Sequence, residues 1–296
     1  MKNFDVSTDS TCDLYAEEIR EKGLFFVPLH YTLAEKDGLN EYLDDYQTKE
    51  EYKEYYDKLR AGIVSKTSML NYACHLEHFY DMAQRGVKEA IHFTISYGLS
   101  PTVDVARQAV EEVQKTYPDF HVLCVESHTT TVGQGMLVNI AVDMRDKGKT
   151  LQETYDYVNS VKEKIQHFIV VKDLMYLKRG GRISGAAAVV GTMLDIHPVI
   201  VFNKIGKLEN YMKVRGLKKT FKTIVKEFEK YTLNADYPTV YVAHTDNEEL
   251  AQDLAAQLKE AYGVTTEIRM IGPIIGSHLG PDAVAYAFLS NEERPI

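Results

Sequence analysis

The sequence predicts an α/β protein of two domains, each with a mainly parallel central sheet flanked by helices. Short apolar runs rich in β-branched residues alternate with longer amphipathic segments along the 296 residues. Such strand–helix alternation is typical of parallel sheets. The length suits two domains, and the polar segment Asp146–Thr150, with its central glycine, is the best linker. We therefore expect an N-terminal domain over residues 1–149 and a C-terminal domain over 150–296.

In the first half, apolar runs and amphipathic segments alternate up to Gly148, a plausible helix C-cap. The expected strands are Asn3–Val6, Phe25–Leu29, Ala90–Ile95 and His121–Val125. The expected helices are Asp13–Lys22, Ser68–Gln84, Pro101–Thr116 and Gly135–Lys147. Pro101–Thr116 is the clearest helix, because valines and alanines form one stripe behind a proline in the first turn. The acidic, tyrosine-rich segment Asp37–Asp57 predicts a loop that runs into a helix near Lys49.

The second half continues the alternation around one strand pair. Pro198–Phe202 and Lys207–Val214 are predicted to pair through a turn at Asn203–Gly206. The other expected strands are Phe168–Val171, Val240–His244, Thr266–Met270 and Ala283–Phe288. The expected helices are Leu151–Ile165, Lys172–Lys178, Ser184–Met193, Leu217–Tyr231 and Glu248–Tyr262.

Composition and charge argue against several classes of function. The chain has 34 basic and 43 acidic residues, whereas non-specific nucleic-acid binding needs clustered positive charge. No run approaches the roughly 20 apolar residues of a transmembrane helix, and the first residues turn polar too soon for a signal peptide. Cys12, Cys74 and Cys124 are widely spaced, which indicates reduced thiols. We therefore expect a cytoplasmic protein without a nucleic-acid partner.

The common nucleotide and hydrolase motifs are missing from the sequence. It contains no GxxxxGK[ST] loop, no GxGxxG fingerprint and no GxSxG elbow. HExxH is also absent, although His75 and His78 are spaced to meet on one helix face. Without an acidic third ligand in view, that pair is interpreted as part of a polar helix face. We expect neither a metal nor a cofactor.

Four strings in the first half place hydroxyl groups and glycines just after strands or at helix starts. They are Ser7–Thr11, Lys66–Ser68, Thr94–Thr102 and Glu126–Gly135. Ligands of open α/β sheets bind beyond the carboxyl ends of the strands, and free N–H groups at helix starts suit an anionic group. Each string alone is better explained by helix N-capping. Four of them in one half favour a shared site.

Two further strings lie in the second half. Leu177–Ser184 places three basic residues and two glycines before a segment of small residues, and Gly272–Pro281 surrounds His278 with glycine and proline. A single histidine is often only a structural hydrogen-bonding group. The neighbouring glycines leave His278 accessible, and an imidazole N–H can donate to a carboxylate.

In this order and spacing, the strings resemble the DegV family of bacterial fatty-acid-binding proteins. The resemblance runs from TDSTCDL through KTS, ISYGLSPT, ESHTTTVGQG, YLKRGGRIS and HPVIVFNKIGKL to GPIIGSHLGP. It implies a lipid-binding carrier that holds one long-chain fatty acid in an apolar tunnel, mainly in the second domain, with the carboxylate near the domain junction. It also implies a separate ATP-dependent fatty acid kinase, which forms an acyl phosphate for phospholipid metabolism, and it allows transient membrane contact.

Site residues follow from the resemblance, position by position. Thr67 and Ser96 look like the hydroxyls that hold the carboxylate, and His278 looks like their neighbour. Arg182 is similar to a basic position linked with the kinase step. These donors are chemically suited to a carboxylate and to a transferring phosphoryl group. The candidate residues of the acyl tunnel are Ile183, Ala187, Val190, Met193, Leu194 and Ile274.

The chain departs from the family pattern at Tyr97, Pro101, His197 and Asp282, and these changes are expected to leave the fold intact while tuning the ligand or partner. Two other functions stay open. A stand-alone hydrolase or transferase would use His278 as general base with a Ser or Thr nucleophile, but Asp9 is the only tempting carboxylate to orient it. An interaction module would use the acidic segment from Asp37 to Tyr56, which is expected to be a solvated surface.

Overall fold

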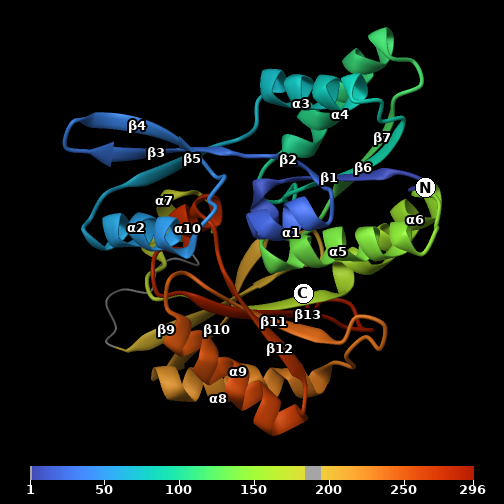
Figure 1. The fold of residues 1–296 in the computed structure, drawn as a ribbon. Coiled ribbons are helices and arrows are strands. Elements are labelled where there is room, and N and C mark those ends of the chain that lie inside the picture. The colour runs from blue at the N-terminus through green and yellow to red at the C-terminus, as the bar shows by residue number, and fades with distance from the viewer. Residues whose placement is uncertain (1, 184–194) are drawn as a thin grey trace.

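The computed structural model describes residues 2–183 and 195–296. Figure 1 shows two sheets stacked one above the other, with helices between them and on both outer faces. Helices α5 (Val132–Asp146) and α6 (Leu151–Val161) occupy the middle layer, and α5 contacts strands of both sheets. One apolar core consequently runs through both halves of the chain.

The upper sheet is parallel, as predicted. Its order is β2-β1-β6-β7, and each neighbouring pair is parallel. The strands are β1 (Asp5–Asp9), β2 (Phe25–Val27), β6 (Glu89–Thr94) and β7 (His121–Glu126). The outer face packs against α3 (Tyr72–Gln84) and α4 (Thr102–Thr116). The short elements η1 (Ser10–Cys12) and α1 (Ala16–Glu21) follow β1.

The lower sheet is mixed, which corrects the expectation of a second mainly parallel sheet. Its order is β10-β9-β8-β13-β11-β12, and among the described residues only β11 and β12 pair in parallel. The strands are β8 (Ile165–Val170), β9 (Ile196–Phe202), β10 (Leu208–Arg215), β11 (Thr239–His244), β12 (Thr265–Met270) and β13 (Val284–Leu289). The predicted β9–β10 pair is confirmed. Strand β13 runs antiparallel to both of its neighbours, β8 and β11. This direction depends on the path of the chain between distant segments, which the local alternation of strands and helices does not encode.

Four further helical elements complete the lower half. The outer face of the mixed sheet packs against α8 (Leu217–Glu227) and α9 (Glu248–Tyr262). The 3-10 turns η2 (Lys162–Lys164) and η3 (Phe228–Lys230) extend α6 and α8. The predicted helix Ser184–Met193 lies outside the described residues. Within residues 2–183 and 195–296, every helix falls short of the length and hydropathy that a bilayer-spanning segment requires.

A third, antiparallel sheet replaces the loop expected after Asp37. Its order is β4-β3-β5, with β3 (His30–Glu35), β4 (Gly38–Leu43) and β5 (Ser65–Ser68). It extends to one side of the molecule, above α2 (Lys49–Arg60), α7 (Met175–Arg179) and α10 (Pro273–Leu279) (Figure 1). Helix α2 begins near Lys49, as predicted, but Ser68 ends a strand instead of starting a helix.

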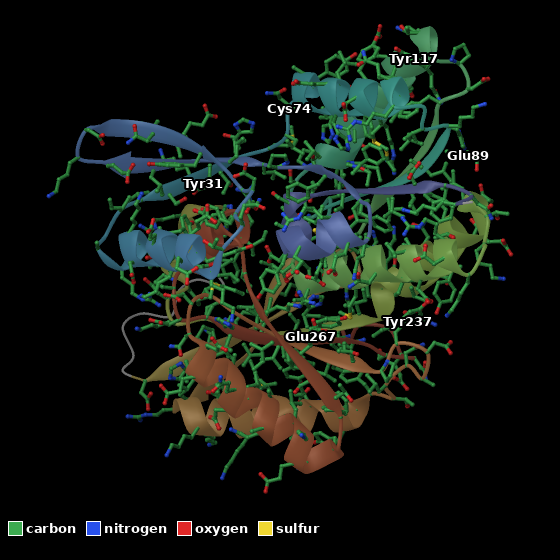
Figure 2. All side chains as sticks on the ribbon, in the orientation of Figure 1. Tyr31, Cys74, Glu89, Tyr117, Tyr237 and Glu267 are labelled. Atoms are coloured by element: carbon green, nitrogen blue, oxygen red, sulfur yellow. The ribbon has the colours of Figure 1, made fainter. Side chains whose placement is uncertain are left out.

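Most of the acidic, tyrosine-rich segment is exposed, as expected for a solvated surface, but its tyrosines pack inward. Tyr52, Tyr55 and Tyr56 on α2 are buried. Tyr31 of β3, labelled in Figure 2, stacks on Tyr42 with 5.4 Å between ring centroids and meets Tyr55 edge-on at the same distance. The tyrosine rings therefore supply apolar packing in the interior, although the segment that carries them is acidic in composition.

His75 and His78 also lie inside the protein and not on the polar helix face that was predicted. His78 Nε2 lies 2.7 Å from the Ser7 hydroxyl, which is also 2.9 Å from His92 Nδ1. His75 Nε2 lies 3.1 Å from the Thr102 hydroxyl. Burial lowers the imidazole pKa to about 4 for His75 and about 3 for His78, so both rings are neutral at pH 7.

This cluster predicts loss of stability in acid. An imidazole whose pKa is lowered by folding stabilises the protein above its unfolded pKa of 6.5, and that stability is lost as the pH falls toward the folded value. His75→Gln is expected to remove up to about 3 kcal/mol of the loss between pH 6.5 and 4. Urea unfolding of the parent and of His75→Gln, at several pH values between 6.5 and 4, measures the free energy of unfolding of each protein.

The difference between variant and parent is the informative quantity. The buried carboxyl groups of Asp9, Asp13 and Asp44 have raised pKa values, so their protonation stabilises the fold as the pH falls and opposes the histidine effect. Identical pH profiles for His75→Gln and its parent would contradict a neutral, buried His75.

Candidate functional site

A largely apolar cavity lies at the junction of the two halves. Strands of the lower sheet and β5 contribute to its wall, together with the segments that follow β2 and β6, the start of α5 and helix α10. Apolar side chains dominate the lining: Leu29, Ile95, Leu99, Val132, Ile169, Leu177, Phe202, Leu208, Ile271, Ile274, Ile275, Leu279 and Ala285. Such a cavity suits an extended hydrocarbon chain, because burying apolar surface releases water.

Three of the predicted polar residues meet at one end of this cavity. Thr67 leaves β5, His278 lies on α10, and Arg182 follows α7; all three line the wall. The Thr67 hydroxyl lies 2.9 Å from His278 Nε2, although the two residues are 211 positions apart. The Arg182 guanidinium donates to the Gly180 carbonyl at 2.5 Å. The cavity therefore ends in hydrogen-bond donors.

His278 is a neutral imidazole in this environment. Burial lowers its pKa to about 4, and the positive charge of Arg182 adds to the shift. With the proton on Nε2, His278 donates to Thr67, and the Thr67 hydroxyl is left to donate to a ligand. His278 Nδ1 is buried and has no hydrogen-bond partner within the described residues. Hydroxyl and guanidinium donors of this kind fit a carboxylate.

A second, polar cavity adjoins the same three residues on the outside. Lys66, Tyr176 and Arg179 line it together with Thr67, Arg182 and His278. Arg179 lies over the Tyr176 ring, with 4.5 Å from the guanidinium carbon to the centroid. Lys66, Arg179 and Arg182 give this cavity three basic side chains.

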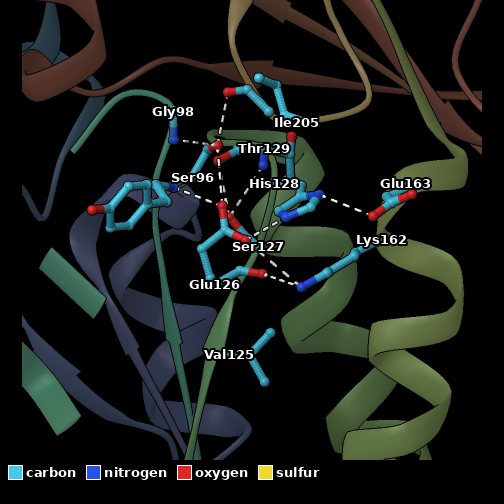
Figure 3. A network of polar contacts seen from close by, with 12 residues as sticks. Ser96, Gly98, Val125, Glu126, Ser127, His128, Thr129, Lys162, Glu163 and Ile205 are labelled. Carbon is cyan, nitrogen blue, oxygen red and sulfur yellow. Dashed lines mark hydrogen bonds and ion pairs between the residues drawn. The ribbon is translucent and has the colours of Figure 1, made fainter. Parts of the chain in front are cut away.

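Ser96 is placed elsewhere, at the contact between β7 and the β9–β10 turn (Figure 3). Its hydroxyl donates to the Gly206 carbonyl at 2.7 Å and to Glu126 at 3.3 Å. Glu126 also lies 2.5 Å from His128 Nε2 and forms an ion pair with Lys162 at 3.7 Å. Ser96 thus tightens the junction between the halves, and its role in binding a carboxylate stays a prediction.

The predicted tunnel residues fall into three groups. Ile274 lines the cavity. Ile183 is buried in the surrounding core but lies outside the cavity wall. Ala187, Val190, Met193 and Leu194 lie outside the described residues.

His167 is a cavity residue that the sequence did not indicate. It lies on β8, and its Nε2 is 3.0 Å from the Thr129 hydroxyl. Burial lowers its pKa to about 3. Gly133 is required beside it, because a Cβ there would lie 2.5 Å from the imidazole. The residue lies in a fully buried strand, and only the fold brings it to the glycine.

The positions where the chain departs from the expected pattern are accommodated locally. Asp282 adopts a left-handed φ of 64°, a conformation that glycine takes easily and aspartate tolerates. Its carboxylate lies 2.8 Å from Lys172 and 3.0 Å from Arg60. Pro101 immediately precedes α4, Tyr97 is exposed, and His197 lies 3.2 Å from Asp195. None of these disturbs the surrounding elements.

Comparisons with known proteins cover the whole chain. The model of the DegV family, described as uncharacterised proteins, matches residues 3–291. A DegV domain-containing protein of Clostridium perfringens is 35% identical over 296 residues, which are 100% of both chains. A DegV lipid binding protein of Thermotoga maritima has 25% identity and a TM-score of 0.84, covering 99% of this chain and 100% of that one.

A second solved structure gives the same result. It is described as showing fatty acid binding by a DegV family protein of Thermus thermophilus, with 25% identity and a TM-score of 0.82. The match covers 98% of this chain and 100% of the other. The similarity therefore includes both sheets and the junction between them.

Proposed function

The chain belongs to the DegV family, and we propose that it binds a single long-chain fatty acid in the cavity between its two sheets. The observation that carries this proposal is an apolar cavity that ends at Thr67, His278 and Arg182. The two solved relatives described as lipid binding and fatty acid binding support it. Each methylene buried in such a cavity contributes about 0.8 kcal/mol.

The carboxylate is placed at Thr67 and His278. A buried carboxylate without donors is costly, and this end of the cavity supplies a hydroxyl paired with an imidazole. Arg182 is close enough to lower the pKa of His278, so its positive charge also reaches the carboxylate. The described tunnel residue Ile274 lies on the same wall.

Binding of palmitate and hexadecanol to the delipidated protein tests this placement. The two molecules share a hydrocarbon chain and differ in the head group. We expect one palmitate per chain in calorimetry and much weaker binding of hexadecanol. Equal affinities would show that the head group is not recognised at this end of the cavity.

Gly180→Ala offers a test that changes no donor. A Cβ on residue 180 would lie 2.0 Å from His278 Nδ1, whereas φ at this position is −71°, so alanine adds no backbone strain. The imidazole must shift, and loss of one charge-assisted hydrogen bond is expected to weaken palmitate binding roughly 10-fold or more. Lys178→Ala, on the same helix, serves as the control. Unchanged affinity in Gly180→Ala would place His278 outside the head-group site.

The finer part of the proposal is presentation of the carboxylate to a separate ATP-dependent fatty acid kinase. The polar cavity outside Thr67 and His278 supports it, since Lys66, Arg179 and Arg182 would attract phosphate groups there. Arg182→Ala is expected to keep bound fatty acid while acyl phosphate formation by a cognate kinase falls. Loss of the fatty acid itself in this variant would instead place Arg182 in lipid binding or folding.

A stand-alone enzyme is less well supported by the geometry. A general base needs a group that orients its imidazole. Among the described residues no carboxylate bonds to His278, and Asp9, the earlier candidate, accepts hydrogen bonds from Thr11, Gln134 and Ile95 instead. Asp9 also caps η1. Fatty-acid binding accounts for the arrangement without a reaction.

A further inference from the structure

The apolar cavity carries a second group of polar residues besides those at its head-group end. Thr130 and Thr131 line it just before the 15-residue helix α5, and Val132, the first residue of that helix, lines it beside them. His167 of β8 belongs to the same wall. A hydrocarbon chain alone has no use for such groups, because an unpaired polar group against apolar surface is costly.

This second group lies toward the end of α10 that is opposite to His278. The Thr131 N–H donates to the Thr11 carbonyl of η1 at 2.7 Å. The Gly272 N–H, at the start of α10, donates to Asp13, the residue after η1. His278 lies in the last turn of α10, and the seven residues of this helix span about 10 Å. An acyl chain that lies along α10 therefore has several carbon atoms between the two polar groups.

The Thr131 hydroxyl has no partner in this wall. The residue is 6% exposed, and its side chain does not cap α5. Its hydroxyl bonds to no described residue, and it is not among the polar atoms that the described residues enclose completely. Its free surface therefore faces the cavity that Thr131 lines. By contrast, the neighbouring Thr130 hydroxyl donates to the Thr11 carbonyl at 3.3 Å.

A free helix N–H lies next to this hydroxyl in the chain. The N–H groups of residues 133–135 bond to the carbonyls of Thr130 and Thr131, whereas the Val132 N–H bonds to no described residue. Thr131 itself has a φ of 51° and a ψ of −135°, a conformation that β-branched residues rarely adopt. Strained backbone of this kind is concentrated at ligand sites.

Resting on the proposed fatty-acid binding, we propose that the cavity prefers a long-chain fatty acid with a hydroxyl group part-way along the chain. The ligand hydroxyl would accept a hydrogen bond from the Val132 N–H and donate one to the Thr131 hydroxyl oxygen. The start of a helix favours an electronegative oxygen. A plain hydrocarbon chain leaves both protein groups unpaired, and sites that bind a ligand hydroxyl discriminate against analogues without it for this reason.

Calorimetry of the delipidated protein with 10-hydroxystearate and with stearate tests the inference. We expect 10-hydroxystearate to bind roughly 10-fold more tightly. Thr131→Val removes the hydroxyl and keeps a β-branched side chain of the same shape, so it is expected to abolish this preference while stearate affinity stays. Thr116→Val, at the exposed end of α4, is the control and keeps the preference. The affinity of 2-hydroxystearate, whose hydroxyl stays beside the carboxylate, is expected not to depend on Thr131.

The possible failures are distinguishable. Equal affinities for stearate and 10-hydroxystearate in the parent protein, which need no variant, would overturn the inference and leave fatty-acid binding intact. An unchanged preference in folded Thr131→Val would also overturn it. Binding of neither molecule would overturn the proposed function together with this inference.

Discussion

Thr67→Val combined with His278→Phe is expected to lower palmitate affinity about 10- to 100-fold. Thr67→Val removes the hydroxyl that donates to the carboxylate, and His278→Phe removes the imidazole that orients this hydroxyl. A hydrogen bond to a charged group contributes about 1.5–3 kcal/mol. Every 1.4 kcal/mol corresponds to about tenfold in affinity. Valine has the shape of threonine, whereas phenylalanine is larger than histidine, so hexadecanol binding serves to report any change in the shape of the cavity. Calorimetry with the delipidated proteins measures the change.

The control for this pair is Thr116→Val, at the exposed end of α4. It makes the same chemical change far from the cavity and is expected to leave affinity unaltered. The hexadecanol affinity of the double variant is also expected to stay close to that of the parent. If palmitate bound the folded double variant as tightly as the parent, these two residues would not form the head-group site.

Arg294→Met is expected to lower the free energy of unfolding by about 3–5 kcal/mol, since buried polar networks are among the costliest to break. Arg294 is 2% exposed, and burial lowers its pKa to about 10. Its guanidinium donates to four backbone carbonyls, those of His128, Lys162, Ile165 and Asn203. These acceptors belong to both halves of the chain, so the Arg294 side chain stabilises the contact between the halves beside the cavity.

Urea unfolding compares this variant with Arg85→Met. Arg85 is exposed and pairs with Asp81 within one helix at 3.0 Å, so its loss is expected to cost less than about 1 kcal/mol. Similar losses in the two variants would show that the Arg294 contacts do not stabilise the junction. The slope of the unfolding curve verifies that both proteins unfold with the same change in exposed surface.

Local sequence signals predicted the class of the fold and the parallel upper sheet. The strand pair around Asn203–Gly206 was also predicted, because a turn between two apolar runs is a short-range feature. The direction of β13 was not, since it depends on the path of a distant segment. The hairpin of β3 and β4 escaped prediction because acidic residues interrupt its apolar pattern, although tyrosines form its buried face.

The residues of the candidate site also divide into those that the sequence predicted and those that only the fold brings into place. Thr67 and His278 were singled out from short strings and a family resemblance, and the structure brings them to 2.9 Å from each other. Ser96 comes from an equally suggestive string, but its hydroxyl faces Gly206, a contact that no local pattern encodes. The contact of His167 with Thr129 is likewise a product of tertiary packing between segments distant in the sequence.

Mass spectrometry of the purified protein, first native and then after denaturing extraction, tests fatty-acid binding most directly. We predict a mass excess equal to one fatty acid per chain, which disappears on denaturation and is recovered in the organic extract. A protein stripped during purification is expected to take up one added palmitate. A chain that carries no lipid and binds no added long-chain fatty acid would contradict the account.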